Sequence, residues 1–158
     1  EDILQLFLTI VKELKIRYCA IGGLAVNVYA EPVVSLDLDL VVAVDQKEKL
    51  LKKLEKKFRI ESFEHSTNLT SKKSDIRIQL QTDPRYQEFI QRSSRKTVLG
   101  YSMRVASAED VLQGKVWAYL DETRRKSKRQ KDLADIFRLV ESQPLLKEKL
   151  PESIKTLL

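Results

Sequence analysis

The stretch AIGGLAVNVYAEPVVSLDLDLVVAV, from Ala20 to Val44, has the most informative pattern in the sequence. It opens with a glycine pair, and thirteen residues beyond that pair an Asp-Leu-Asp sequence interrupts an apolar run. In a strand, residues i and i+2 point to the same face, about 6.5–7 Å apart along the chain. The pattern therefore predicts that Asp37 and Asp39 project side by side, while the opposite face enters the core through Leu36, Leu38 and Leu40.

Two carboxylates this close repel each other unless they are protonated or bridged by cations. Oxygen ligands of this kind suit Mg²⁺, which accepts one or two carboxylates together with substrate phosphates. Gly22 and Gly23 lie between a predicted strand and a predicted helix, where missing side chains let a phosphate approach the helix N-terminus. Each feature alone also fits a simple tight turn or a solvated strand face.

A third strand acid strengthens the pattern. Asp75 lies in SDIRIQL, where Arg77 and Gln79 share its face and apolar residues alternate on the other. A glycine pair, paired acids and a third acid in one short chain are typical of sites where two metal ions promote in-line displacement at phosphorus.

Composition sets outer limits on the class of protein. The chain has 158 residues, a formal charge of +6 and 42% hydrophobic residues, as in an ordinary globular domain that favours an anionic partner. One cysteine, Cys19, rules out a disulfide within the chain and favours the reducing cytoplasm. No apolar run reaches membrane-spanning length, so we expect no membrane partner.

Periodicity predicts alternating helices and strands in one α+β (α/β) domain covering residues 1–158. The expected helices are Asp2–Leu14, Leu24–Ala30, Gln46–Lys57, Asp83–Ser93, Ser107–Leu120 and Asp132–Ser142. The expected strands are Arg17–Ile21, Ser35–Val44, Phe58–Phe63 and Ser74–Gln81, followed by a hairpin over Lys96–Ala106 that turns at Gly100. Two prolines are expected to break up a polar C-terminal tail.

The signature Ile21-Gly22-Gly23, followed after thirteen residues by Asp37-Leu38-Asp39-Leu40, resembles that of the minimal nucleotidyltransferase (polymerase-beta-like) superfamily. The stretches IGGLAVNVYAEPVVSLDLDLVV and VASAEDVLQGKVWAYLDETRRKSKRQKDLADIFRLV are similar to the AbiEii/AbiGii-type toxin group and its small relatives. The resemblance covers roughly Tyr18 to Val140. It implies a nucleotidyltransferase fold, with a mixed central sheet flanked by helices in a core of about residues 17–106 and a C-terminal helical part of about 107–158.

The same resemblance implies roles for individual residues. Two Mg²⁺ ions would be bound by Asp37, Asp39 and Asp75, which would also be the catalytic residues. The nucleotide, ATP or another NTP, would be bound by Gly22, Gly23, Ser35 and Lys115. A final motif of less certain role is matched by Lys131 and Asp132. The group often has arginine and threonine where this chain has Val33 and Ser35, which puts nucleotide affinity in doubt.

A basic run follows the predicted helix that ends at Leu120. It is either a flexible loop between two helices or a patch that guides RNA or nucleotide phosphate through Arg124, Arg125, Lys128 and Arg129. We predict a Mg²⁺-dependent nucleotidyltransferase that moves an NMP from an NTP to a hydroxyl on RNA, protein or a small molecule. The alternatives are a non-catalytic nucleotide- or RNA-binding module with the same fold, and an RNA-binding or toxin–antitoxin partner protein that acts through the basic run.

Overall fold

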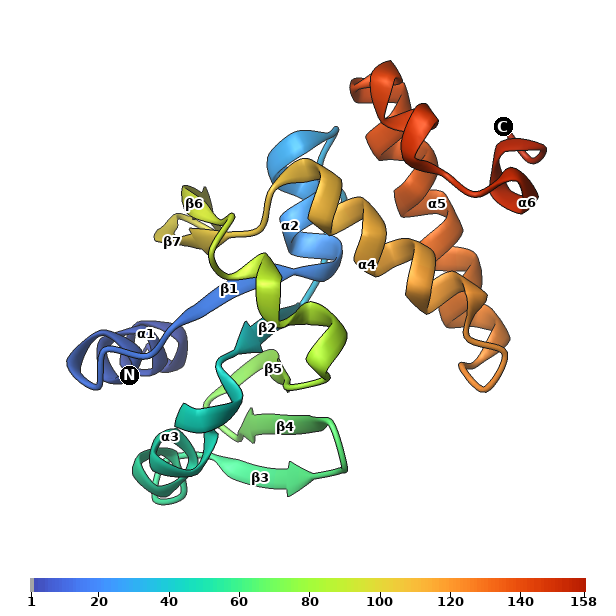
Figure 1. Ribbon diagram of the computed structural model, residues 1–158. Coiled ribbons are helices and arrows are strands. Elements are labelled where there is room, and N and C mark those ends of the chain that lie inside the picture. The colour runs from blue at the N-terminus through green and yellow to red at the C-terminus, as the bar shows by residue number, and fades with distance from the viewer. Residues whose placement is uncertain (1) are drawn as a thin grey trace.

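A mixed sheet forms the centre of the computed structural model, which describes residues 2–158 (Figure 1). Within those residues the sheet has seven strands in the order β3-β4-β5-β2-β1-β7-β6. The strands are β1 (Tyr18–Ile21), β2 (Asp37–Val42), β3 (Arg59–Ser62), β4 (Ser66–Ser71), β5 (Ser74–Gln81), β6 (Ser94–Val98) and β7 (Tyr101–Val105). Strand β2 is central, because it pairs in parallel with β5 and antiparallel with β1. The predicted α+β class with a mixed central sheet is confirmed.

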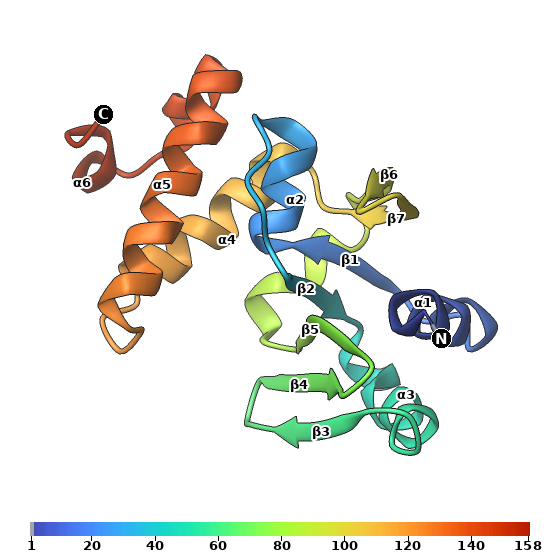
Figure 2. The ribbon, with the colours of Figure 1, turned by 180° about the vertical axis from the view of Figure 1, so that it is seen from behind.

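Helices cover the sheet in two groups. They are α1 (Ile3–Glu13), α2 (Gly22–Tyr29), α3 (Lys47–Leu54), α4 (Ala108–Leu120), α5 (Lys126–Ser142) and α6 (Glu152–Lys155), with 3₁₀ turns η1 (Val44–Gln46), η2 (Pro84–Phe89) and η3 (Pro144–Lys149). Helices α4 and α5 lie side by side and contact α2, whereas α1 and α3 contact each other on the opposite side of the molecule (Figures 1 and 2). No helix in the described part of the chain combines the length and apolar character needed to cross a membrane.

Side-chain alternation fixes how β2 sits in the core. Leu38 and Leu40 are fully buried, and Asp37 and Asp39 point the other way and are half-buried. Leu36 does not join the core as predicted, because it precedes the strand and is 48% exposed. The antiparallel pairing of β1 places Ile21 opposite Asp39, so the end of β1 delivers the glycine pair to the second acid.

Local capping explains where two of the helices begin. The side chain of Asp2 accepts a hydrogen bond from the N–H of Gln5, 3.0 Å away, at the start of α1. The Ser107 side chain accepts from the N–H of Asp110 at 3.2 Å, which caps α4 at the start of the helix predicted from Ser107. The predicted hairpin turn also forms, with Gly100 at a positive φ of 84°.

The structure also differs from the sequence-based expectations in other local features. Strand β4 was not predicted, because its sequence STNLTS is mostly polar and only Thr67 and Leu69 are buried. The expected helix over Asp83–Ser93 is the shorter 3₁₀ turn η2. The C-terminal tail is not simply polar, since η3 and α6 bury Leu146 and Ile154.

The basic run is largely helical and does not form the flexible loop that was one of its two interpretations, because α5 begins at Lys126 and carries most of the run in its first turns. Lysine, arginine and glutamine are good helix formers, so the segment KSKRQK extends the helix that the apolar pattern predicted only from Asp132.

Candidate active site

The two acids of β2 meet β5 across a parallel pairing. Asp37 is in register with Arg77, and Asp39 with Gln79. The Oδ1 atom of Asp37 accepts a hydrogen bond from Arg77 Nε at 2.7 Å. The outer face of the central sheet therefore carries two carboxylates and one guanidinium side by side.

The glycine pair packs directly against this acidic face. Gly22 has a positive φ of 75°, and a Cβ at this position would collide with the carboxylate of Asp39. A Cβ on Gly23 would lie 3.8 Å from Asp135 Oδ2 and 3.9 Å from Ser35 Oγ. The N-terminus of α2 is thus brought against the second acid of the pair, Ser35 and α5.

Asp39 is in an unusual electrostatic environment. Burial raises the pKa of its carboxyl group to about 6, and the nearby charge of Asp37 acts in the same direction. The positive charges of Lys115, Arg124 and Lys128 oppose this rise in the pKa. A carboxylate that burial and a neighbouring anion disfavour is stabilised by a further cation beside it.

Lys115 joins α4 to α5 beneath the site. Its Nζ atom lies 3.1 Å from Asp132 Oδ1 and 2.9 Å from Asp135 Oδ2. Arg124 Nε pairs with Asp132 at 2.7 Å, and Arg138 Nη2 with Asp135 at 2.7 Å. Burial lowers the pKa of Lys115, but the charges of Asp135 and Asp132 outweigh it, so the pKa is raised and the lysine stays charged.

Sequence reasoning missed Asp135 and Arg138. Their signal was present, because Asp132 and Asp135 are three residues apart on a predicted amphipathic helix and so share a face. The Arg138 guanidinium also donates to Asn27 Oδ1 at 3.1 Å and to the carbonyl of Glu31. It therefore connects α5 to the loop that leads into β2.

That loop holds Val33, the residue found where the resembling group often has arginine. Asn27 of α2 donates from Nδ2 to the Val33 carbonyl at 2.7 Å and accepts from the Val33 N–H at 3.0 Å. The Val33 side chain is 54% exposed. The loop is thus fixed through its backbone and contributes Ser35, whose Oγ accepts from the Asp37 N–H at 3.3 Å.

The remaining predicted site residues differ in exposure: some face solvent, and others are held in the Lys115 network. Asp75 is exposed near the start of β5, two residues before Arg77. Lys131 is exposed, whereas its neighbour Asp132 is only 1% exposed and belongs to the Lys115 network.

Two arginines of the basic run are held by the protein itself. Arg124 pairs with Asp132, and Arg129 donates to the Tyr119 carbonyl at 2.7 Å. The exposed members of the predicted patch are Arg125 and Lys128.

The donor set of Asp37 and Asp39 fits Mg²⁺ in its chemistry, because both residues supply hard carboxylate oxygens from the same face of β2. Across residues 2–158, no three histidine, cysteine, aspartate or glutamate side chains gather closely enough to hold a metal ion. The structure thus brings Asp37 and Asp39 together without a third such group, and the role of Asp75 stays a prediction.

An aromatic cluster packs η2 against α4. The rings of Phe89 and Trp117 stack with centroids 5.8 Å apart, and Tyr86 meets Trp117 edge-on at 5.1 Å. A Cβ on Gly114 would lie 3.4 Å from the Tyr86 ring, so the small residue allows this close approach. Trp117 is therefore a packing residue, although Arg85 covers its ring with the guanidinium carbon 4.9 Å from the centroid.

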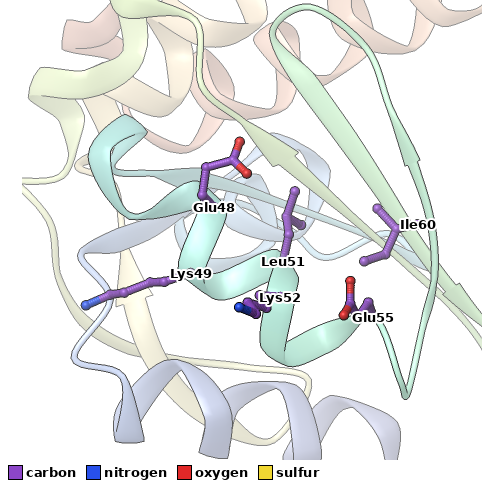
Figure 3. A pocket seen from close by; sticks show the side chains of 6 residues that line it. All are labelled: Glu48, Lys49, Leu51, Lys52, Glu55 and Ile60. Atoms are coloured by element: carbon purple, nitrogen blue, oxygen red, sulfur yellow. The ribbon is translucent and has the colours of Figure 1, made fainter.

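A surface hollow of about 690 Å³ lies between α3 and β3 (Figure 3). It is lined by Glu48, Lys49, Leu51, Lys52, Glu55 and Ile60. Strand β3 is at the edge of the sheet, separated from β2 by β4 and β5. The hollow is therefore distinct from the acidic site.

Several solved structures have a similar fold. The antibiotic-resistance factor ANT(2″)-Ia, in complex with adenylyl-2″-tobramycin, matches with a TM-score of 0.64 at 14% identity over 98% of this chain and 93% of that one. The lincosamide antibiotic adenylyltransferase LnuA, bound to lincomycin, matches with a TM-score of 0.58 at 14% identity over 86% and 95%. An antigenic nucleotidyltransferase-like protein from Paracoccidioides brasiliensis matches with a TM-score of 0.53 at 22% identity over 87% and 72%. The chain therefore has the nucleotidyltransferase fold.

The amino-acid sequence also assigns the chain to a family within this fold. Residues 59–158 match the family model described as "Nucleotidyl transferase AbiEii toxin, Type IV TA system". The chain belongs to this AbiEii nucleotidyltransferase family, as its resemblance implied. The matched region contains Lys115, Asp132 and Asp135 and begins after the glycine pair and the acids of β2. A comparison with curated protein sequences gives no significant match.

Proposed function

We propose that the protein is a Mg²⁺-dependent nucleotidyltransferase, which moves a nucleoside monophosphate from an NTP to an acceptor hydroxyl and releases pyrophosphate. The observation that carries this proposal is the packing of Gly22 against Asp39, beside Asp37 on the same face of β2. Family membership and fold support the same class of reaction.

In this proposal Asp37 and Asp39 hold the metal, with Asp75 as a third carboxylate. When bound, two Mg²⁺ ions would activate the acceptor hydroxyl and stabilise the leaving pyrophosphate. The chain itself would position the nucleotide: Gly22 and Gly23 would offer the backbone N–H groups of the α2 N-terminus to phosphates, and the Ser35 hydroxyl lies beside Gly23.

Lys115 would contact the triphosphate through one donor only. An ammonium group has three N–H donors, and Asp132 and Asp135 occupy two of them. The lysine is thus held in place by α5, and its charge already acts on Asp39. Asp132 and Asp135 would be positioning residues. Lys131 is on the exposed face of α5 and would contact the nucleotide only from there.

The proposal extends to the acceptor and to the biological role of the protein. The adenylylated tobramycin named with ANT(2″)-Ia favours a small-molecule hydroxyl, while the toxin–antitoxin description of the family favours RNA or protein as target and an antitoxin-type protein as partner. Arg125 and Lys128, exposed on the first turns of α5, are suited to RNA phosphate. We further propose that the protein acts in the cytoplasm, where NTPs are available and a free thiol such as Cys19 is kept reduced.

A second candidate function is a nucleotide-binding module without chemistry. The observation that favours it is the ion pair between Arg77 and Asp37, which already engages one of the carboxylate oxygens that a metal would need. Tight nucleotide binding that does not depend on Mg²⁺, without turnover, is what this candidate requires.

The test is to incubate the protein with Mg²⁺ and each of four α-³²P-labelled NTPs, with total RNA and cell extract as acceptor sources. We expect label in one acceptor class, and no label with an Asp37→Ala/Asp39→Ala variant that remains folded. Label transferred equally well by the variant would refute the assignment of the site. No label from the wild type, together with metal-independent nucleotide binding, would favour the binding module.

A further inference from the structure

Arg77 lies directly across the parallel strands from Asp37, and its Nε atom is 2.7 Å from Asp37 Oδ1. Its neighbour on the same strand face, Gln79, is turned the other way, because its Nε2 atom donates to Asn68 Oδ1 on β4 at 3.1 Å. Arg77 is therefore the β5 side chain that reaches toward the acidic pair.

The fold does not require this contact. The two side chains are 66% and 43% exposed, and an ion pair so open to solvent contributes little to stability. Strand β5 is held beside β2 by its backbone, which keeps the register from Asp37↔Arg77 to Val41↔Gln81 and includes the hydrogen bond from the Arg77 N–H to the Leu36 carbonyl at 2.9 Å. The sheet would keep its pairing with a different side chain at position 77.

The contact does affect what else Asp37 can bind. A divalent cation at Asp37 would compete with the guanidinium for Oδ1 and would also be repelled by its charge. Guanidinium groups bind phosphate oxygens as well as carboxylates, in the same forked geometry. A triphosphate entering the site thus offers Arg77 another anionic partner.

We propose that Arg77 couples metal binding to nucleotide binding. In the free protein the guanidinium occupies Asp37 and weakens the binding of a metal ion alone. When the nucleotide is present, Arg77 moves to its phosphate oxygens and leaves Asp37 open to the ion. This inference rests on the proposed function, and linkage requires that metal and nucleotide each increase the affinity of the other by the same factor.

The test compares Mn²⁺ binding, followed by the electron paramagnetic resonance signal of the free ion, in protein without nucleotide. We expect Arg77→Gln to bind Mn²⁺ at least threefold more tightly than the wild type. Arg77→Lys, which keeps the charge but loses the fork, should fall between them. The matched control is Arg59→Gln, an exposed arginine on the edge strand β3 far from the acids, which should bind as the wild type does.

A second measurement addresses the coupling itself. The affinity for a non-hydrolysable ATP analogue is measured by calorimetry with and without Mn²⁺. We expect the gain in affinity from the metal to be at least threefold larger in the wild type than in Arg77→Gln. Circular dichroism and thermal unfolding establish that each variant is folded.

The possible outcomes distinguish a failure of the coupling through Arg77 from a failure of the metal site at Asp37 and Asp39. Equal Mn²⁺ affinity in wild type and Arg77→Gln, with weaker binding in an Asp37→Asn/Asp39→Asn variant, would overturn the coupling and leave the metal site intact. If none of these proteins binds Mn²⁺ more tightly than the doubly substituted variant, both the coupling and the metal site are wrong.

Discussion

Gly22 and Asp39 are packed so closely that position 22 has no room for a Cβ, and the backbone there has a φ of +75°. Gly100 has a similar φ of +84°, but nothing lies within 4 Å of the position of its Cβ. Substituting alanine at each of the two glycines therefore distinguishes the cost of a left-handed backbone, which both positions share, from the cost of a clash with Asp39, which only position 22 has.

We expect Gly100→Ala to lower the free energy of unfolding by about 1–2 kcal/mol, the cost of a left-handed conformation for an L-residue. Gly22→Ala should cost at least about 1 kcal/mol more, because Asp39 must shift, as in an overpacked core. Urea unfolding measures both. Equal losses would mean that the Asp39 carboxylate is not packed against position 22.

Lys115 is 11% exposed and pairs with two aspartates. Removing one partner of a buried ion pair typically costs 3–5 kcal/mol; we expect Lys115→Met to cost about 3 kcal/mol, since Arg124 and Arg138 still face the two acids. Arg17→Met, which breaks the exposed pair with Asp45, should cost much less than Lys115→Met. Similar effects in chemical unfolding would show that the Lys115 network is no more important than a surface pair.

Cys19 is fully buried, and burial raises the pKa of its thiol from 9.0 to about 12. Because the folded pKa is the higher one, the stabilisation is complete below pH 9 and is lost as the pH rises toward 12. Between pH 8 and pH 10 the wild type should lose about 1.4 kcal/mol through this group, a loss that Cys19→Ala should lack. Parallel stability curves for the two proteins across this range would contradict the burial of the thiol.

Substitutions in the first turns of α5 test the alternative function, in which the protein binds RNA through the basic run. We expect Arg125→Ala/Lys128→Ala to weaken RNA binding and to reduce its salt slope by about 1.4, the value for two phosphate contacts with a single strand. Lys52→Ala/Lys53→Ala, on the exposed face of α3, is the charge-matched control. Unchanged RNA binding in the α5 variant would remove RNA guidance from the role of this helix.

The sequence predicted the central part of the fold because its signals there are physically strong. The Asp-Leu-Asp alternation determined which face of β2 is buried, and the capping serine at position 107 marked the start of α4. Strand β4 could not be predicted in the same way, because its residues are held by pairing with β3 and β5 rather than by an apolar face of their own.

The candidate site was predictable only in part, for a similar reason. Motif spacing indicated the acids and the glycine pair as candidates, and the resemblance to a known family added Lys115. It could not show that Arg77 is in register with Asp37, because register depends on how two distant strands pair. Nor could it show that Asp135 shares Lys115 with Asp132, since that contact depends on the packing of α5 against α4.

The proposed role of Asp37 and Asp39 in nucleotidyl transfer can be tested by the position of a radioactive label in the products. Parallel reactions with α-³²P and γ-³²P NTP are run with the wild type, with Asp39→Asn and with Asp45→Asn, which changes an exposed acid outside the site. We predict that wild type and Asp45→Asn transfer the α label and release the γ label as pyrophosphate, and that Asp39→Asn does neither. Transfer of the γ label to the acceptor, or full activity in Asp39→Asn, would contradict the account.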